Sequence, residues 1–188
     1  MREYDKMVAG LAYNPIDEEL VNLRKRAKDL CFKYNNTLPS LEATKKEIIN
    51  ELIPDNKGSF HIEPSFWCDY GLNIHLGENF YSNHNLVILD VADVIIGNNV
   101  LFGPNVAIYT AYHPLDEKTR ISGIEYGKKI VIEDNVWVGG NSIILPGVTI
   151  KKGAIIGAGA VVTKDVSENT TVVGNKARPL IRKTNNEI

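Results

Sequence analysis

The stretch IEDNVWVGGNSIILPGVTIKKGAIIGAGAVVTKDVS, residues 132–167, divides into six consecutive hexads without a gap. The first position of each hexad is Ile or Val, the fifth is small or β-branched, and Gly or another turn-forming residue usually stands between them. A period of six does not fit a helix face, and over this length it argues against a plain hairpin sheet. It describes a triangular parallel β-helix in which three hexads make one coil and coils stack about 4.8 Å apart.

The repeat extends upstream with one interruption. The hexads IGNNVL and FGPNVA, residues 96–107, keep the pattern, and the phase survives the interruption because 132 − 108 = 24, or four hexads. An earlier run begins with LGENFY at residue 76 and slips by two residues near Asp93. We therefore expect a β-helix over residues 58–173, with an extruded loop at about 110–129 and a C-terminal tail at 174–188.

The first 57 residues are predicted to be helical. In residues 14–36 apolar side chains recur at three- and four-residue spacing behind Asn14, the expected N-cap, and Pro15. Residues 40–53 repeat this pattern with Ser40 as the expected cap. Two short amphipathic helices need a surface to pack on, and we expect them to cover one end of the solenoid. The flat sides of such a solenoid favour a closed cyclic trimer.

The composition of the 188-residue chain excludes several functions. The net charge is −2 without a block of like charges, so nucleic-acid or membrane-surface binding is not expected. The N-terminus has acidic residues and no apolar core, and the longest apolar stretch is too short to span a bilayer, so a cytoplasmic protein is expected. The two cysteines are too few for a disulfide framework, and Cys31 lies on an apolar helix stripe, as expected of a core residue.

The interruption TAYHPLDEKTRISGIEYGKK, residues 110–129, is the candidate for function. A β-helix coil has no natural cleft, and a loop of about twenty residues inside a compact domain is usually functional. His113 is the loop residue with a pKa near neutrality, and Pro114 restricts it to an extended conformation. From the residues alone, a catalytic histidine and a solvent-exposed histidine without a role are equally compatible with this loop.

The order of motifs resembles the maltose/galactoside O-acetyltransferase branch of the hexapeptide-repeat acyltransferases. The resemblance rests on KMVAGLAYNPIDEEL (6–20), RAKDLCFKYN (26–35), CDYGLNIHLGENFYSN (68–83), ILDVADVIIGNNVLFGPNV (88–106), YTAYHPLD (109–116), VWVGGNSIILPGVTI (136–150), IGAGAVVTKDV (156–166) and GNKAR (174–178). Hexads alone are shared with many acyltransferases, whereas the helical segment with CDYG and YTAYHP is narrower. The resemblance implies a left-handed parallel β-helix with an N-terminal α-helical segment.

The resemblance also implies an activity. Enzymes of this branch transfer the acetyl group of acetyl-CoA to a sugar hydroxyl, here a 6-OH of a maltose- or glucose-type acceptor, by direct attack on the thioester. His113 matches their general base, which deprotonates the hydroxyl and supplies on the order of 10²–10⁴-fold in rate. The implied assembly is a homotrimer with its sites between subunits, acetyl-CoA is the co-substrate, and no metal is required.

Further site residues follow from the same resemblance. The acceptor side would be formed by Asp17, Asp69, Tyr81, Asn83, Asp90 and Glu125. The acetyl-CoA side would be formed by Asn83, Trp137, Gly139, Gly140, Ala158, Thr163, Lys164 and Arg178. Each also has a structural reading, such as a first-turn helix acid for Asp17 and a coil-turn glycine for Gly139. One departure concerns the tail, where Lys176 replaces a proline usual in the family and Pro179 follows Arg178.

Other functions stay open from the sequence. The acceptor could instead be an antibiotic hydroxyl, an amino sugar or serine, and a non-catalytic solenoid scaffold is a third class, although it would not need the histidine loop. A zinc enzyme on this fold needs three converging histidines, and His61, His75, His84 and His113 form no close pair in sequence. An acyl-cysteine route is disfavoured because Cys68 has no neighbouring histidine in sequence.

Overall fold

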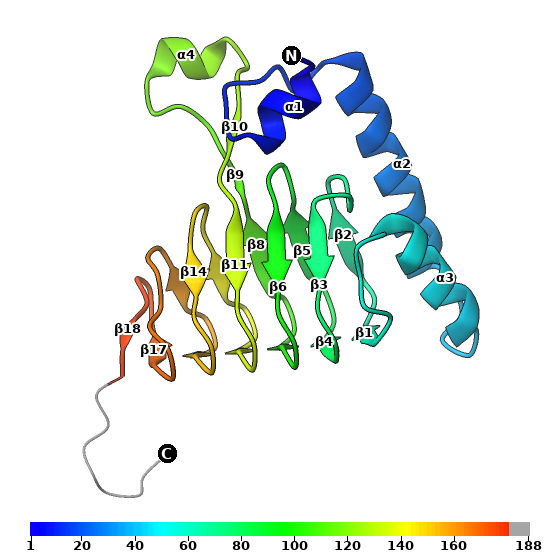
Figure 1. The fold of residues 1–188 in the computed structure, drawn as a ribbon, viewed down its shortest axis with the longest axis vertical. Coiled ribbons are helices and arrows are strands. Elements are labelled where there is room, and N and C mark those ends of the chain that lie inside the picture. Colours follow the sequence, from blue (N-terminus) through cyan, green and yellow to red (C-terminus); the bar gives the residue numbers. More distant parts are fainter. Residues whose placement is uncertain (181–188) are drawn as a thin grey trace, which may run out of the picture.

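The computed structural model describes residues 1–180 and shows a parallel β solenoid capped at one end by helices (Figure 1). This confirms the predicted β-helix. The part of the predicted tail beyond residue 180 lies outside the described residues. None of the helices in residues 1–180 is long and apolar enough to cross a membrane.

Three parallel sheets form the walls of the solenoid, and each takes its strands from successive coils. The first wall contains, in spatial order, β1 (Phe60–Ile62), β4 (Phe80–Ser82), β7 (Leu101–Phe102), β12 (Trp137–Val138), β15 (Ile155–Ile156), β17 (Thr171–Val173) and the antiparallel β18 (Arg178–Pro179). The second wall contains β2 (Phe66–Cys68), β5 (Leu86–Leu89), β8 (Ala107–Tyr109), β13 (Ile143–Ile144) and β16 (Val161–Val162). The third wall contains β3 (Ile74–Leu76), β6 (Val94–Ile96), β11 (Ile130–Ile132) and β14 (Thr149–Ile150).

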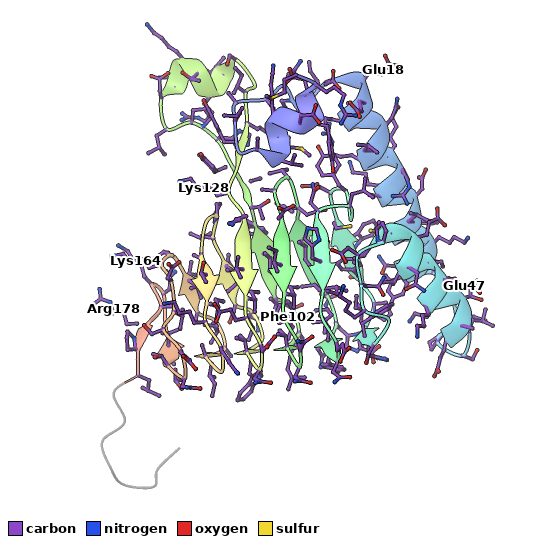
Figure 2. All side chains as sticks on the ribbon, in the orientation of Figure 1. Glu18, Glu47, Phe102, Lys128, Lys164 and Arg178 are labelled. Carbon is purple, nitrogen blue, oxygen red and sulfur yellow. The ribbon has the colours of Figure 1, made fainter. Side chains whose placement is uncertain are left out.

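The hexad positions have the roles that the pattern predicts. The residues at the first and fifth positions between 132 and 167 are all buried, because they point into the solenoid. The aromatic rings of Phe80 and Phe102 pack edge to face inside it, with centroids 5.1 Å apart. Figure 2 labels Phe102 within the solenoid. In the first five of these six hexads the fourth position turns the chain with a positive φ and is Asn or Gly, as at Asn135 (59°) and Gly147 (84°); the sixth has Asp165 there.

The turn asparagines also join neighbouring coils. In one ladder the Asn79 side-chain amide donates to Oδ1 of Asn99 at 3.0 Å, and the Asn99 amide donates to Oδ1 of Asn135 at 3.1 Å. A parallel ladder joins Asn85 to Asn105 and Asn105 to Asn141 in the same way. A single residue type thus supplies the left-handed turn and a hydrogen bond to each adjacent coil.

Three helices precede the solenoid, namely α1 (Glu3–Val8), α2 (Glu18–Asn35) and α3 (Glu42–Leu52). The buried stripes of α2 and α3 join the solenoid core and cover its first coil, as Figure 1 shows. The predicted caps are wrong: Asp17, not Asn14, caps α2, and α3 begins after Leu41 without a side-chain cap. Asn14 instead accepts a hydrogen bond from the Ile16 N–H within a turn, which delays the helix start.

All departures from the six-residue rhythm fall at one edge of the solenoid. Between the inward-facing residues that pair from coil to coil the usual step is six, but it is 76 − 68 = 8 and 96 − 88 = 8 in the first two coils, 132 − 108 = 24 in the third, and only 166 − 162 = 4 in the fifth. Each longer step connects the second wall to the third wall. We call this edge, residues 69–73, 89–93 and 109–129, the widened corner. The two-residue slip in the sequence therefore marks extra residues in the first two coils, at the same edge as the loop of the third coil.

The loop at the widened corner is folded. The strands β9 (Ala111–Tyr112) and β10 (Tyr126–Gly127) pair antiparallel, and helix α4 (Glu117–Ile121) forms the tip, which lies beside α1 in Figure 1. The rings of Tyr112 and Tyr126 stack with centroids 5.4 Å apart, and the Lys128 ammonium lies 5.1 Å from the Tyr112 ring centroid. These contacts hold the two strands of the loop together.

Candidate functional site

The base of the widened corner is organised by a buried carboxylate. Asp90 is 0% exposed, and its Oδ1 accepts the backbone N–H groups of Asp69 (3.0 Å) and Tyr70 (2.9 Å). Its backbone carbonyl accepts the Asn73 side-chain amide at 2.7 Å. Burial raises the pKa of Asp90 to about 7. This enclosed carboxylate holds the turn that presents Asp69, and its predicted contact with the acceptor stays a prediction.

Asp69 is the carboxylate that this turn offers toward the loop. It is partly buried, and burial raises its pKa above the usual range; the nearby Arg24 guanidinium opposes this shift, while the Glu125 carboxylate adds to it. Arg24 comes from α2 and donates to the Tyr70 hydroxyl at 2.6 Å and to the Pro15 carbonyl. The corner thus combines two carboxylates and one guanidinium at the junction of helix, coil and loop.

His113 and Glu125 face each other across the loop. Nε2 of His113 lies 3.8 Å from Oε1 of Glu125, and their side chains are 57% and 25% exposed. The other Glu125 oxygen accepts the Tyr13 hydroxyl at 2.7 Å, and the backbones of Tyr13 and Glu125 pair antiparallel through two bonds of 3.2 Å. Burial, with the hydrogen bond to Glu125, raises the pKa of Tyr13, so its hydroxyl stays a donor. The carboxylate is consequently fixed on one side and open to the imidazole on the other.

A second edge of the solenoid, between the first and second walls, is rich in glycine and alanine. We call it the glycine corner; it connects the first wall to the second and contains Asn83, Gly103, Gly139, Gly140, Gly157 and Ala158. Coils approach closely here, since a Cβ on Gly139 would lie 2.6 Å from the Ala158 nitrogen. Among the described residues no protein acceptor takes the backbone N–H of Gly140 or Ala158. The glycine corner therefore presents the unpaired N–H groups of Gly140 and Ala158 among small residues.

The two corners do not meet within one chain. The second wall separates them, since each coil leaves the glycine corner and runs along this wall before it reaches the widened corner. No hydrogen bond or ion pair within residues 1–180 joins His113, Glu125 or Asp69 to Asn83, Gly139 or Ala158. The Asn83 side chain instead accepts the His84 backbone N–H at 2.7 Å. His113, Asp69 and Glu125 thus lie at one edge, and Asn83, Gly139, Gly140 and Ala158 lie at another.

The outer face of the first wall is apolar. Tyr81, Leu101, Trp137 and Ile155 stand side by side on β4, β7, β12 and β15, and Leu101 and Trp137 are 48% and 53% exposed. Tyr81 stacks on His61 with a centroid separation of 5.7 Å. The second wall likewise leaves Trp67 39% exposed beside Val87. Contiguous exposed aromatic and aliphatic side chains of this kind are typical of a protein interface.

The remaining predicted residues lie toward the ends of the molecule. Asp17 caps α2 by accepting the Glu19 N–H at 3.0 Å, which is the helix role that its position allows. Thr163 and Lys164 follow β16 on the same edge as the widened corner, and Arg178 lies on β18. Figure 2 shows Lys164 and Arg178 together at the solenoid end remote from the helices. This end is therefore cationic, and all three side chains are exposed.

Two residues of the site were not anticipated from sequence. Tyr13 binds Glu125 across 112 residues, and Arg24 binds Tyr70 across 46 residues. Such long-range partners leave no local pattern. The helical position of Arg24, one turn after the buried Leu20, is the signal that could have placed it on the core-facing side. No cluster of three or more His, Cys, Asp or Glu side chains suited to a metal ion occurs in residues 1–180.

Comparison with known proteins finds matches for both the N-terminal helical segment and the solenoid. Residues 6–55 match the maltose acetyltransferase hexapeptide capping motif, and residues 129–164 match the bacterial transferase hexapeptide with six repeats. A galactoside O-acetyltransferase of Lactococcus lactis subsp. lactis is 37% identical over 93% of this chain and 84% of its own length.

Solved structures extend the comparison to three dimensions. The crystal structure of a maltose O-acetyltransferase from Clostridium difficile 630 is 48% identical, with a TM-score of 0.94 over 96% of each chain. A hexapeptide-repeat acetyltransferase of Vibrio cholerae O1, crystallised with acetyl coenzyme A, is 38% identical, with a TM-score of 0.89 over 96% of this chain and 98% of its own. The likeness therefore includes the capping helices, the solenoid and the loop.

Proposed function

This chain belongs to the hexapeptide-repeat acetyltransferases that carry the maltose acetyltransferase capping motif, and on that premise we propose that it moves the acetyl group of acetyl-CoA to a sugar hydroxyl. The observation that carries the proposal is the His113–Glu125 pair at the widened corner. A maltose- or glucose-type acceptor with a reacting 6-OH is the proposed substrate, in keeping with the family members of known name.

His113 is the proposed general base. A sugar hydroxyl is a weak nucleophile at neutral pH, and a positioned imidazole contributes on the order of 10²–10⁴-fold when it removes the hydroxyl proton. The adjacent Glu125 carboxylate, whose Oε1 lies 3.8 Å from Nε2 of His113, is placed to orient the imidazole. The attacking oxygen then forms the new ester bond to the acetyl carbon, the thioester C–S bond breaks, and the proton held by His113 is available to the leaving CoA sulfur.

The acceptor sugar is proposed to bind between the turn and the loop. Asp69 and Glu125 offer carboxylate oxygens, which accept hydrogen bonds from sugar hydroxyls, and both lie at the widened corner with His113. Arg24 keeps Asp69 near a positive charge and so supports its ionised form. Tyr81, Asn83 and Asp17 remain proposed acceptor contacts, and Tyr81 and Asn83 would have to come from a second subunit.

The acetyl-CoA arm is proposed to lie along the glycine corner. The unpaired N–H groups of Gly140 and Ala158 suit the amide carbonyls of pantetheine, and the small residues around them permit a close approach. Trp137, Thr163, Lys164 and Arg178 complete the proposed donor site, where the cationic end matches the nucleotide phosphates. CoA supplies the activated acetyl group, and no step assigned here needs a metal.

The division of residues between two corners supports a homotrimer with sites between subunits. If the apolar outer walls pack on neighbouring copies, the widened corner of one subunit can face the glycine corner of the next. Leu115 at the loop tip is 98% exposed and could reach the neighbouring solenoid. A site assembled in this way has its base and its donor wall from different chains.

The proposal is tested by measuring thiol release from acetyl-CoA with and without glucose, maltose and a galactoside. Wild-type protein should show sugar-dependent release, and His113→Ala should lose about 10²–10⁴-fold of it. Glu125→Gln should also lose activity, whereas Glu117→Gln, a matched charge change in the same loop but away from His113, should not. Sugar-dependent release that persists at the wild-type rate in His113→Ala would overturn the assigned base. Acetyl-CoA binding without release to any sugar would overturn the assigned acceptor class.

A further inference from the structure

The two cysteines of the chain meet in the core between the helical cap and the first coil. Cys31 on α2 and Cys68 at the end of β2 are 0% and 5% exposed, and their Sγ atoms lie 3.9 Å apart. The burial of Cys31 confirms its predicted place in the core. Neither thiol has a role in the acetyl transfer proposed above. The chain contains no other cysteine, so each thiol has one possible partner within the chain.

This contact is built by the register of two elements rather than by one flexible side chain. Asn35 donates to the Phe66 carbonyl at 3.0 Å and accepts the Phe66 N–H at 2.8 Å, which fixes the end of α2 against β2. Four helical residues rise about 6 Å and two strand residues about 6.6 Å. Stepping from Asn35 to Cys31 and from Phe66 to Cys68 therefore brings the two sulfur atoms opposite each other.

We propose that Cys31 and Cys68 form a redox-active dithiol that closes to an intrachain disulfide on exposure to peroxide. A disulfide needs a sulfur–sulfur distance of about 2 Å, which side-chain rotation within the 3.9 Å contact can approach without a change of fold. The bridge would join the helical cap covalently to the first coil. Cys68 directly precedes Asp69, so the bond would form next to the turn held by Asp90.

The chemistry balances with peroxide as the oxidant. Within the 3.9 Å pair, the hydrogen bond to the other sulfur lowers the pKa of one thiol, written here as Cys31, and this sulfur is oxidised first. Peroxide transfers one oxygen to Cys31, giving a sulfenic acid and water. The Cys68 sulfur then attacks the Cys31 sulfur, the S–O bond breaks, and the hydroxyl leaves as water with the proton of Cys68.

The test treats the intact, folded protein with hydrogen peroxide and then blocks free thiols with an alkylating reagent in denaturant. The expected product has lost the mass of two hydrogen atoms, carries no alkyl group, and yields a tryptic peptide that links Cys31 to Cys68. Cys31→Ala and Cys68→Ala are the matched controls, and each should leave a single thiol that is oxidised without a cross-link. A dithiol reductant should restore both thiols.

Three results would overturn the inference. One is a folded protein whose thiols stay free or advance to sulfinic acid while the same peroxide cross-links the protein in guanidinium. Another is a cross-link between chains on a non-reducing gel. The third is a thermal midpoint that is unchanged or lower after oxidation, because a bridge between pre-aligned sulfurs 37 residues apart should raise it by about 5–15 °C. The last measurement needs no cysteine variant, so it holds even if the variants fold poorly.

Discussion

Replacing Asn99, the central residue of one asparagine ladder, tests how the coils are held together. Asn99 has φ 55°, accepts the Asn79 amide and donates to Asn135. Asn99→Ala puts at this left-handed turn a residue that tolerates positive φ less well than Asn, at about 1–2 kcal/mol, and removes two hydrogen bonds worth about 0.5–1.5 kcal/mol each. The expected loss of unfolding free energy is therefore about 2–5 kcal/mol.

The measurement is equilibrium unfolding in urea at one fixed protein concentration, because association couples stability to concentration. Asn99→Gly is the matched variant: it removes the same two hydrogen bonds but tolerates positive φ, so it should cost less than Asn99→Ala. If Asn99→Gly costs as much as Asn99→Ala, the backbone conformation is not the reason for asparagine at this position. If Asn99→Ala changes stability by less than about 0.5 kcal/mol, the ladder contributes nothing.

Three further predictions concern packing and pH. Gly139→Ala should cost about 1–3 kcal/mol in urea unfolding, because its Cβ would lie 2.6 Å from the Ala158 nitrogen; wild-type stability would show that the coils can separate there. Burial raises the pKa of Asp90 to about 7, so its contribution to the free energy of unfolding is full below about pH 4 and falls by about 4 kcal/mol as the pH rises to about 7. Asp90→Asn should remove this pH dependence. Unfolding free energies that change with pH in parallel for both proteins would contradict the prediction. Burial lowers the pKa of His75, but the hydrogen bonds to Asp55 and Asp93 outweigh burial and raise this pKa above its usual value. The stability that His75 adds over His75→Gln should therefore be full below about pH 6.5 and disappear as the pH rises through the raised pKa. An advantage of the wild type that grows with pH would refute this.

The fold could be predicted because every coil repeats the same six-residue pattern of inward-facing and turn positions. Inward positions must be aliphatic or small at every coil, and the left-handed turn accepts only residues such as Asn135 or Gly147 at low cost. Local signals were weaker at the helices. The cap of α2 was misplaced because Asn14 and Asp17 are both capping residues within a few positions. Helix α1 is only six residues long and leaves little periodic pattern.

The site was harder to predict because its contacts are long-range. His113 could be found as the histidine of an interrupted repeat, but its neighbour Glu125 and the partner Tyr13 come together only when the chain folds. For Asp90, the sequence indicates that a buried carboxylate needs a partner but does not identify the partner. A carboxylate within an apolar run needs a partner, and the sequence could not show that this partner is the backbone of the Asp69 turn rather than a ligand.

The most direct test of acetyl transfer at a shared site is subunit complementation. His113→Ala and Asn83→Ala, one variant from each corner, should each be inactive alone in the sugar-dependent thiol-release assay. When equal amounts are unfolded, mixed and refolded, random closed trimers place an intact His113 beside an intact Asn83 of the next subunit in about one quarter of the sites. We predict that the mixture recovers about one quarter of the wild-type rate. A mixture of folded trimers that stays inactive would contradict a site built from the widened corner of one chain and the glycine corner of another.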